Sequence, residues 1–175
     1  MNYFELYELP VSFTPDAEAV KKKYYELSRK YHPDRFTLAG DAERAEALRM
    51  AAMNNDAYKT LNSADATMAY ILKLNALLED EEKYSLPPDF LMEMMELNEV
   101  VSEMELNPDD ATAKSEALAM MESEVSGWNE EAQPLIAKFN NGDTSKEVLL
   151  EIKDYYFRRK YLLRIQQRIN TFAAH

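Results

Sequence analysis

The chain has no cysteine, only three glycines, and no apolar run near the roughly 18 residues that a membrane-spanning helix needs. Without cysteine there can be no disulfide bond and no thiolate metal site. The opening residues, Met1 to Glu5, lack the basic region and apolar stretch of a secretion signal. We therefore expect a cytoplasmic protein with no membrane contact, no metal and no other cofactor.

The residues that are abundant, Ala, Leu, Met, Glu and Lys, are helix formers. Apolar residues make up 46% of the 175 residues, which is enough to build a buried core. The composition therefore predicts an all-α protein made of one domain of ordinary size or two small ones.

Charge is distributed unevenly along the chain, whose net charge is −12. Residues 80–131 contain 16 Asp or Glu against two lysines, whereas residues 20–35 contain six Lys or Arg against two acids. An acidic protein repels phosphate, so we expect no nucleic-acid partner. The basic and acidic regions should bind different partners.

The first part of the chain predicts an antiparallel helical hairpin after a short helix at residues 2–8. The first long helix should run from Asp16 to Tyr31, with Thr14 as its N-cap. Helical spacing resumes over residues 41–61 and again over 64–78. The expected buried stripe of the 41–61 helix comprises Ala45, Leu48, Ala52, Asn55, Ala57 and Tyr58.

His32-Pro33-Asp34 lies between the two long helices. Proline fixes its own φ and disfavours helix at the preceding residue, so the first helix should stop here and a polar turn should follow. Considered alone, the tripeptide is only a helix stop with an incidental histidine, and its flanks must decide its meaning.

A charged run and two prolines at residues 79–88 predict a linker, which divides the chain into domains 1–78 and 89–175. The second domain should be a three-helix bundle with Trp128 in its core. Pro134 should kink the middle helix or divide it in two. Thr144 with Glu147 forms an expected capping box for the last helix.

The first 75 residues resemble a J-domain, because His32-Pro33-Asp34 follows a basic helix and precedes a helix that carries Asn54-Asn55-Asp56-Ala57-Tyr58. J-domains are co-chaperones that stimulate ATP hydrolysis by DnaK-type 70-kDa chaperones. The resemblance implies that this chain activates a chaperone and is not itself an enzyme. The residues expected to bind the chaperone are His32, Pro33, Asp34, Lys21, Lys22, Arg29, Lys30 and Arg35, whereas Tyr24 is expected to be mainly core.

Three further stretches carry a more specific resemblance: Tyr3-Phe4-Glu5-Leu6 with Leu9-Pro10, Tyr31-His32-Pro33-Asp34-Arg35-Phe36, and Asp89-Phe90-Leu91-Met92-Glu93-Met94-Met95-Glu96-Leu97. This similarity to the HscB family covers nearly the whole chain. It implies an L-shaped protein that pairs a J-domain with a three-helix domain, and two partners: a DnaK/HscA-type chaperone and the IscU-type iron–sulfur scaffold. The residues implied to bind the scaffold are Leu91, Met95, Glu96, Glu99, Glu103 and one aromatic residue, either Tyr156 or Phe157.

Other interpretations stay open at the level of sequence. The acidic helical domain could bind a client unrelated to iron–sulfur clusters. The other methionines of this domain, Met92, Met94, Met104, Met120 and Met121, are expected to fill the core. A helical enzyme that uses His32 and Asp34 as an acid–base pair is disfavoured, because no second group of catalytic residues accompanies them.

Overall fold

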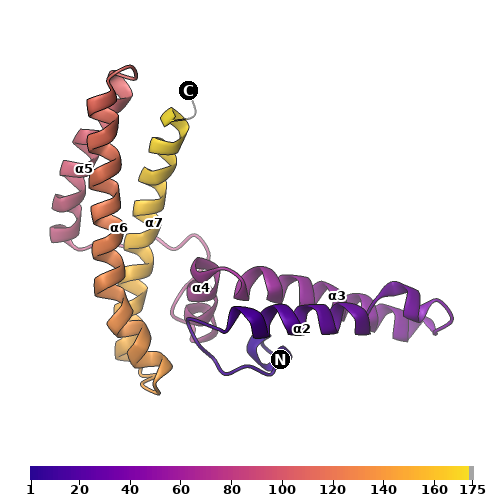
Figure 1. Cartoon of the computed structure of the whole chain (residues 1–175). Helices are drawn as coiled ribbons and strands as arrows, with labels where there is room; N and C mark the ends of the chain where they lie inside the picture. Colours follow the sequence, from indigo (N-terminus) through magenta and orange to yellow (C-terminus); the bar gives the residue numbers. More distant parts are fainter. Residues whose placement is uncertain (174–175) are drawn as a thin grey trace. The chain divides into compact units, whose positions relative to one another are not determined.

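The computed structural model describes residues 1–173, and the side chains of residues 1–172 (Figure 1). Every regular element in this range is a helix. The chain divides into two compact units, Met1–Ala76 and Leu77–His175. The prediction of an all-α protein with a helical hairpin followed by a three-helix bundle is confirmed. The elements are α1 (Tyr3–Leu6), α2 (Ala17–Lys30), the 3-10 helix η1 (Pro33–Phe36), α3 (Asp41–Leu61), α4 (Ala64–Leu74), α5 (Pro88–Leu106), α6 (Ala111–Asn140) and α7 (Lys146–Ala173).

The first unit is the hairpin of α2 and α3, with α1 and α4 packed on α3 (Figure 1). Its core side chains come from all four α-helices: Phe4, Tyr7, Val20, Ala57, Leu61, Ile71 and Leu72. The prediction that Thr14 caps α2 is wrong. Asp16 is the N-cap, and its Oδ1 accepts from the backbone N–H of Glu18 at 3.1 Å.

The predicted register of α3 is also wrong. The buried residues are Ala47, Met50, Asn54, Ala57 and Leu61, while Leu48 is 63% exposed. Alanine and methionine occur around much of this helix, so hydrophobicity alone distinguishes its faces weakly. Packing against α2 decides which face is buried.

A buried asparagine joins three helices of the first unit. The Asn54 amide donates to the Tyr24 carbonyl at 3.0 Å and to Ser28 Oγ at 3.2 Å. Its Oδ1 accepts from the Tyr7 hydroxyl at 2.7 Å. Burial raises the pKa of Tyr7, so the hydroxyl stays protonated and keeps donating. This network fixes α1 and α2 against α3, and thereby holds in place the turn that joins α2 to α3.

The second unit is a bundle of α5, α6 and α7 (Figure 1). Its core includes Met94, Leu97, Met121, Trp128 and Ile152, and Trp128 is only 8% exposed, as predicted. The Trp128 indole donates to the Tyr155 carbonyl at 2.8 Å. A division of the middle helix is ruled out, because α6 runs without a break through Pro134.

Polar side chains hold both ends of α7. The expected capping box of Thr144 and Glu147 is wrong, because α7 begins one residue later and Ser145 Oγ accepts from the N–H of Val148 at 3.4 Å. At the other end of the bundle, Arg168 bridges α7 to α5 through Asn98 Oδ1, at 2.8 Å, and Glu105.

The segment before α5 is attached to α7 by side chains. Glu82 pairs with Lys153 at 2.7 Å, and the Tyr84 hydroxyl donates to Asp154 Oδ1 at 2.8 Å. The Tyr84 ring stacks on Phe157 with centroids 4.4 Å apart. In the described part of the chain, no helix is long and apolar enough to cross a membrane, and no three acidic or histidine side chains are grouped as a metal site would need.

Candidate functional site

The turn after α2 is built by its own backbone and by the His32 ring. His32 has an extended backbone, and Pro33 then opens η1 with the φ that proline imposes. The His32 carbonyl accepts from the N–H of Arg35 at 3.0 Å, and His32 Nδ1 accepts from the N–H of Asp34 at 3.2 Å. In this arrangement the neutral ring carries its proton on Nε2. The exposed Nε2–H is then free to donate to a partner.

Four of the residues expected to bind a chaperone surround one groove of about 350 Å³ at this turn: Arg29, His32, Asp34 and Arg35. Asp34 is 88% exposed and its Oδ2 lies 3.6 Å from His32 Nδ1. The side chains that line the groove therefore include a carboxylate, an imidazole and two guanidinium groups.

Tyr25 also lines this groove, is 50% exposed, and was missed by sequence reasoning. The signal was available: Tyr25 lies off the buried stripe of α2, four residues after Lys21 and four before Arg29, so it shares their face. Its neighbour Tyr24, expected mainly in the core, is half-buried and stacks on Tyr58 with centroids 4.3 Å apart.

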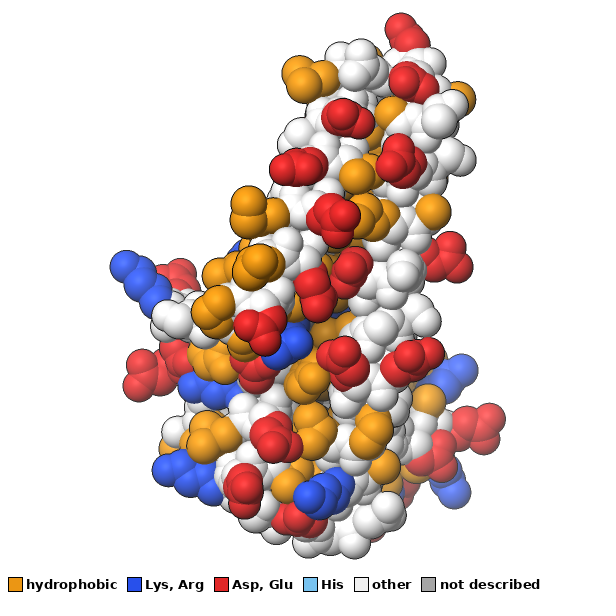
Figure 2. Space-filling model, turned by 90° about the vertical axis from the view of Figure 1, so that its left-hand side faces the viewer, with side chains coloured by type: hydrophobic (Ala, Val, Ile, Leu, Met, Phe, Trp, Pro, Cys, Tyr) orange, Lys and Arg blue, Asp and Glu red, His pale blue; other side chains and the backbone are white. Residues whose placement is uncertain are grey.

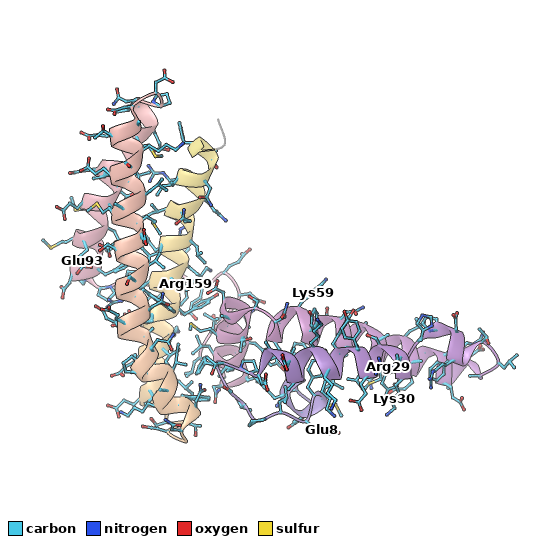
Figure 3. The ribbon with its side chains drawn as sticks, in the orientation of Figure 1. Glu8, Arg29, Lys30, Lys59, Glu93 and Arg159 are labelled. Carbon is cyan, nitrogen blue, oxygen red and sulfur yellow. The ribbon has the colours of Figure 1, made fainter. Side chains whose placement is uncertain are left out.

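Lys21, Lys22 and Lys30 of α2 are also exposed, but they do not line the groove at the turn. Lys21 and Lys22 line a second hollow with Tyr25, Tyr58 and Asn62. Lys30 lies over the Tyr31 ring, 5.3 Å from its centroid. Arg29 and Lys30 are labelled on α2 in Figure 3. Pro33, like His32 and Asp34, is exposed.

The second candidate surface is the outward face of α5. The helix buries Phe90, Met94, Leu97, Val101 and Met104, at alternating spacings of four and three residues. The other side carries Leu91, Met92 and Met95, which are 41%, 71% and 63% exposed. The expectation that Met92 fills the core is therefore wrong, whereas Met94, Met104 and Met121 are buried.

Carboxylates accompany these apolar side chains along α5. Glu96, Glu99 and Glu103 are exposed, and α5 contains six acids and no Lys or Arg. Figure 2 shows hydrophobic side chains interleaved with acidic ones along this face of the bundle, and Glu93 projects outward in Figure 3. Burial, reinforced by repulsion from Glu93, Glu131 and Glu96, raises the pKa of Glu124 on the neighbouring helix. The α5 surface, defined as Leu91, Met92, Met95, Glu96, Glu99 and Glu103, is thus apolar and negatively charged.

The two alternatives for an aromatic residue on α7 differ in burial. Phe157 is 8% exposed because it stacks on Tyr84. Tyr156 is half-buried, meets Phe157 edge-on at 5.1 Å, and lies beneath Lys160 Nζ at 5.7 Å. Tyr156 is therefore the more accessible of the two rings.

A helical hairpin with an exposed His-Pro-Asp turn beside a basic helix defines the first unit as a J-domain. A family model described as the HSCB C-terminal oligomerisation domain matches residues 86–170, which lie in the second unit. The co-chaperone protein HscB homolog of Photobacterium profundum is 30% identical over 173 residues, which cover 98% of this chain and 99% of that protein. The homolog of Vibrio vulnificus is 39% identical over 127 residues, 72% of each chain. The chain belongs to the HscB family of co-chaperones.

Solved structures agree with this assignment. Chaperone HscB from Vibrio cholerae matches with a TM-score of 0.75 and 25% identity, covering 99% of this chain and 98% of that one. Human co-chaperone protein HscB matches with a TM-score of 0.77 and 26% identity, covering 98% of this chain and 81% of that one.

Proposed function

We propose that this chain brings an IscU-type iron–sulfur scaffold to a DnaK/HscA-type chaperone and stimulates the ATPase of that chaperone. The chain supplies two binding surfaces and no catalytic group of its own. The observation that carries the proposal is the placement of these surfaces on separate compact units: the His32-Pro33-Asp34 turn on one and the α5 surface on the other.

The chemistry of the turn groove supports chaperone binding. Arg29 and Arg35 give the groove a positive rim that steers it toward an acidic surface. His32 and Asp34 then offer a donor and an acceptor in a geometry fixed by the turn, so little order has to be gained on binding. Binding to the turn then favours the chaperone conformation that fits His32 and Asp34 best.

The chemistry of the α5 surface supports scaffold binding. Leu91, Met92 and Met95 provide apolar area that a partner can cover, and the methionines adapt readily to the shape of a partner. The glutamates repel one another along the helix, and a basic partner relieves that repulsion. The expected scaffold therefore presents an apolar patch bordered by Lys or Arg.

The ATPase part is tested by steady-state hydrolysis of the cognate chaperone with wild-type chain and with His32→Gln. Glutamine keeps a polar side chain but removes the ring that braces the turn through Nδ1. We expect the variant to leave hydrolysis at the level seen without the chain. Equal stimulation by both proteins would contradict the assignment of the turn.

The scaffold part is tested by titrating purified scaffold against Leu91→Ala/Met95→Ala. Loss of two apolar contacts near the centre of an interface should weaken binding by roughly 10- to 100-fold. Leu106→Ala is the matched control, because Leu106 lies at the end of α5 outside the α5 surface and is 80% exposed. Unchanged scaffold affinity in the double variant would contradict the assignment of scaffold binding to the α5 surface.

A further inference from the structure

The helix α5 is much shorter than the two helices on which it packs. It has 19 residues, against 30 in α6 and 28 in α7. Its contacts with α7 begin near the middle of that helix, where Arg158 lies over the Phe90 ring and Phe90 meets Tyr161. They continue toward the C-terminal end, where Asn98 accepts from Arg168 and Glu105 pairs with Arg168. In Figure 1, α6 and α7 continue as a pair beyond the N-terminal end of α5.

The uncovered part of α7 presents the same face that α5 covers further along. Glu147, Leu150 and Asp154 follow one another at three and four residues, and Tyr161 lies seven residues after Asp154. Residues spaced this way share one side of a helix. The third position of the bundle is therefore filled by α5 at one end and unfilled at the other.

A groove of about 740 Å³ lies at this unfilled position. Its apolar lining comes from Pro134, Leu135, Leu150 and the rings of Tyr84 and Tyr155. Leu150 is 44% exposed, a large fraction for a leucine between two helices. We call this surface the α6/α7 groove.

Four carboxylates line the same groove: Glu131, Glu147, Glu151 and Asp154. Two of them are compensated, because Arg158 lies 2.6 Å from Asp154 and 3.9 Å from Glu131. Glu147 and Glu151 form no ion pair with any side chain among residues 1–172, and they lie four residues apart on α7, where like charges repel. Lys153, two residues after Glu151, is paired with Glu82 at 2.7 Å.

We propose that the α6/α7 groove is a docking site for a short basic amphipathic helix of a partner protein. Such a helix completes the three-helix bundle, with leucine-sized side chains against Leu135 and Leu150 and with Lys or Arg beside Glu147 and Glu151. The lining residues of α7 span Glu147 to Tyr155, about 12 Å at 1.5 Å per residue, which fits about two helical turns. The groove shares no residue with the α5 surface, so this inference goes beyond the proposed scaffold binding.

The test uses the full chain and a fluorescein-labelled model helix of about 14 residues, long enough to hold helical structure. The peptide contains Leu, Ala and Lys, with leucines at helical spacing on one face and lysines on both flanks. A second peptide has Glu in place of every Lys. We expect fluorescence anisotropy to report binding of the basic peptide and none of the acidic one.

Two variants locate the binding site. Glu147→Gln/Glu151→Gln and Leu150→Ala should each weaken binding of the basic peptide, the double variant by about tenfold. Glu116→Gln/Glu122→Gln is the matched control, because it removes two exposed charges from α6 outside the groove. Equal weakening by groove and control variants would overturn the proposal, since binding would then follow net charge alone. Absence of binding to wild type would also overturn it, whatever the scaffold titration shows.

Discussion

The buried amide of Asn54 gives a prediction whose magnitude follows from the structure. Replacing it with alanine removes hydrogen bonds to the Tyr24 carbonyl, Ser28 Oγ and the Tyr7 hydroxyl. Each bond contributes about 0.5–1.5 kcal/mol net, and the side chain is 1% exposed, so water cannot fully replace the lost partners. Asn54→Ala should destabilise the first unit by about 2–4 kcal/mol, which is a large share of the stability of a small domain.

The matched control is Asn55→Ala, the next residue of α3, whose exposed side chain loses only a long hydrogen bond of 3.4 Å from the Tyr24 hydroxyl. Both substitutions raise helix propensity equally, so their difference isolates the buried network. Urea unfolding followed by far-UV circular dichroism reports both units, whereas fluorescence of Trp128, the only tryptophan, reports the second unit. With a urea slope of about 1 kcal/mol per molar for so small a unit, the dichroism transition of Asn54→Ala should move down by about 2 M or more. A midpoint equal to that of Asn55→Ala would refute the role given to this network.

Three further predictions concern the second unit, and all are measured by urea unfolding with Trp128 fluorescence. Gly127→Ala should stabilise the second unit by about 0.5–1 kcal/mol, because an added Cβ meets nothing within 4 Å and alanine favours helix. A loss of stability in this variant would contradict the prediction. The raised pKa of Glu124 means that the folded state holds its proton more tightly than the unfolded state, so its charge opposes folding at pH 7. Glu124→Gln should therefore be more stable than wild type at pH 7, and this gain in stability should shrink as pH falls through the folded-state pKa of Glu124. A stability gain that grows on acidification would contradict the prediction. Burial and Asp154 raise the pKa of Tyr84 to about 12, so its hydroxyl donates to Asp154 at neutral pH. Tyr84→Phe should therefore lower the free energy of unfolding by about 1 kcal/mol, and an unchanged free energy of unfolding would contradict a stabilising role for that hydrogen bond.

Sequence reasoning predicted the helices better than their faces. The stop at His32-Pro33-Asp34 depends on proline, whose backbone effect is local. The turn after α6 likewise contains Gly142, whose φ of 116° suits glycine. The face of α3 depends on tertiary contacts instead. A buried polar residue such as Asn54 runs against the hydrophobic pattern, and its burial is understood only once Tyr7, Tyr24 and Ser28 are placed around it.

The caps show a similar limit. Thr14 and Thr144 were reasonable caps by residue type, but Asp16 and Ser145 lie one or two residues closer to the helices and accept from the free N–H groups. Helix ends are therefore located by sequence only to within a residue or two.

The residues of the candidate sites could also be predicted only in part from the sequence. Leu91 and Met95 share one face of α5 by their spacing, and both are exposed, whereas Met92 was expected in the core and is exposed beside them. Tyr25 was missed because an aromatic residue is expected to be buried, although its position on α2 placed it with the lysines. The α6/α7 groove could not be inferred from sequence, because it depends on which turns of α6 and α7 the shorter helix α5 leaves uncovered.

The most direct test of the central claim measures how much IscU-type scaffold an immobilised DnaK/HscA-type chaperone captures in the presence of ATP. Wild-type chain should increase the amount of scaffold captured. His32→Gln and Leu91→Ala/Met95→Ala should each abolish that increase, because each disables one of the two surfaces while the other stays intact. Capture at the wild-type level by both variants would contradict the account.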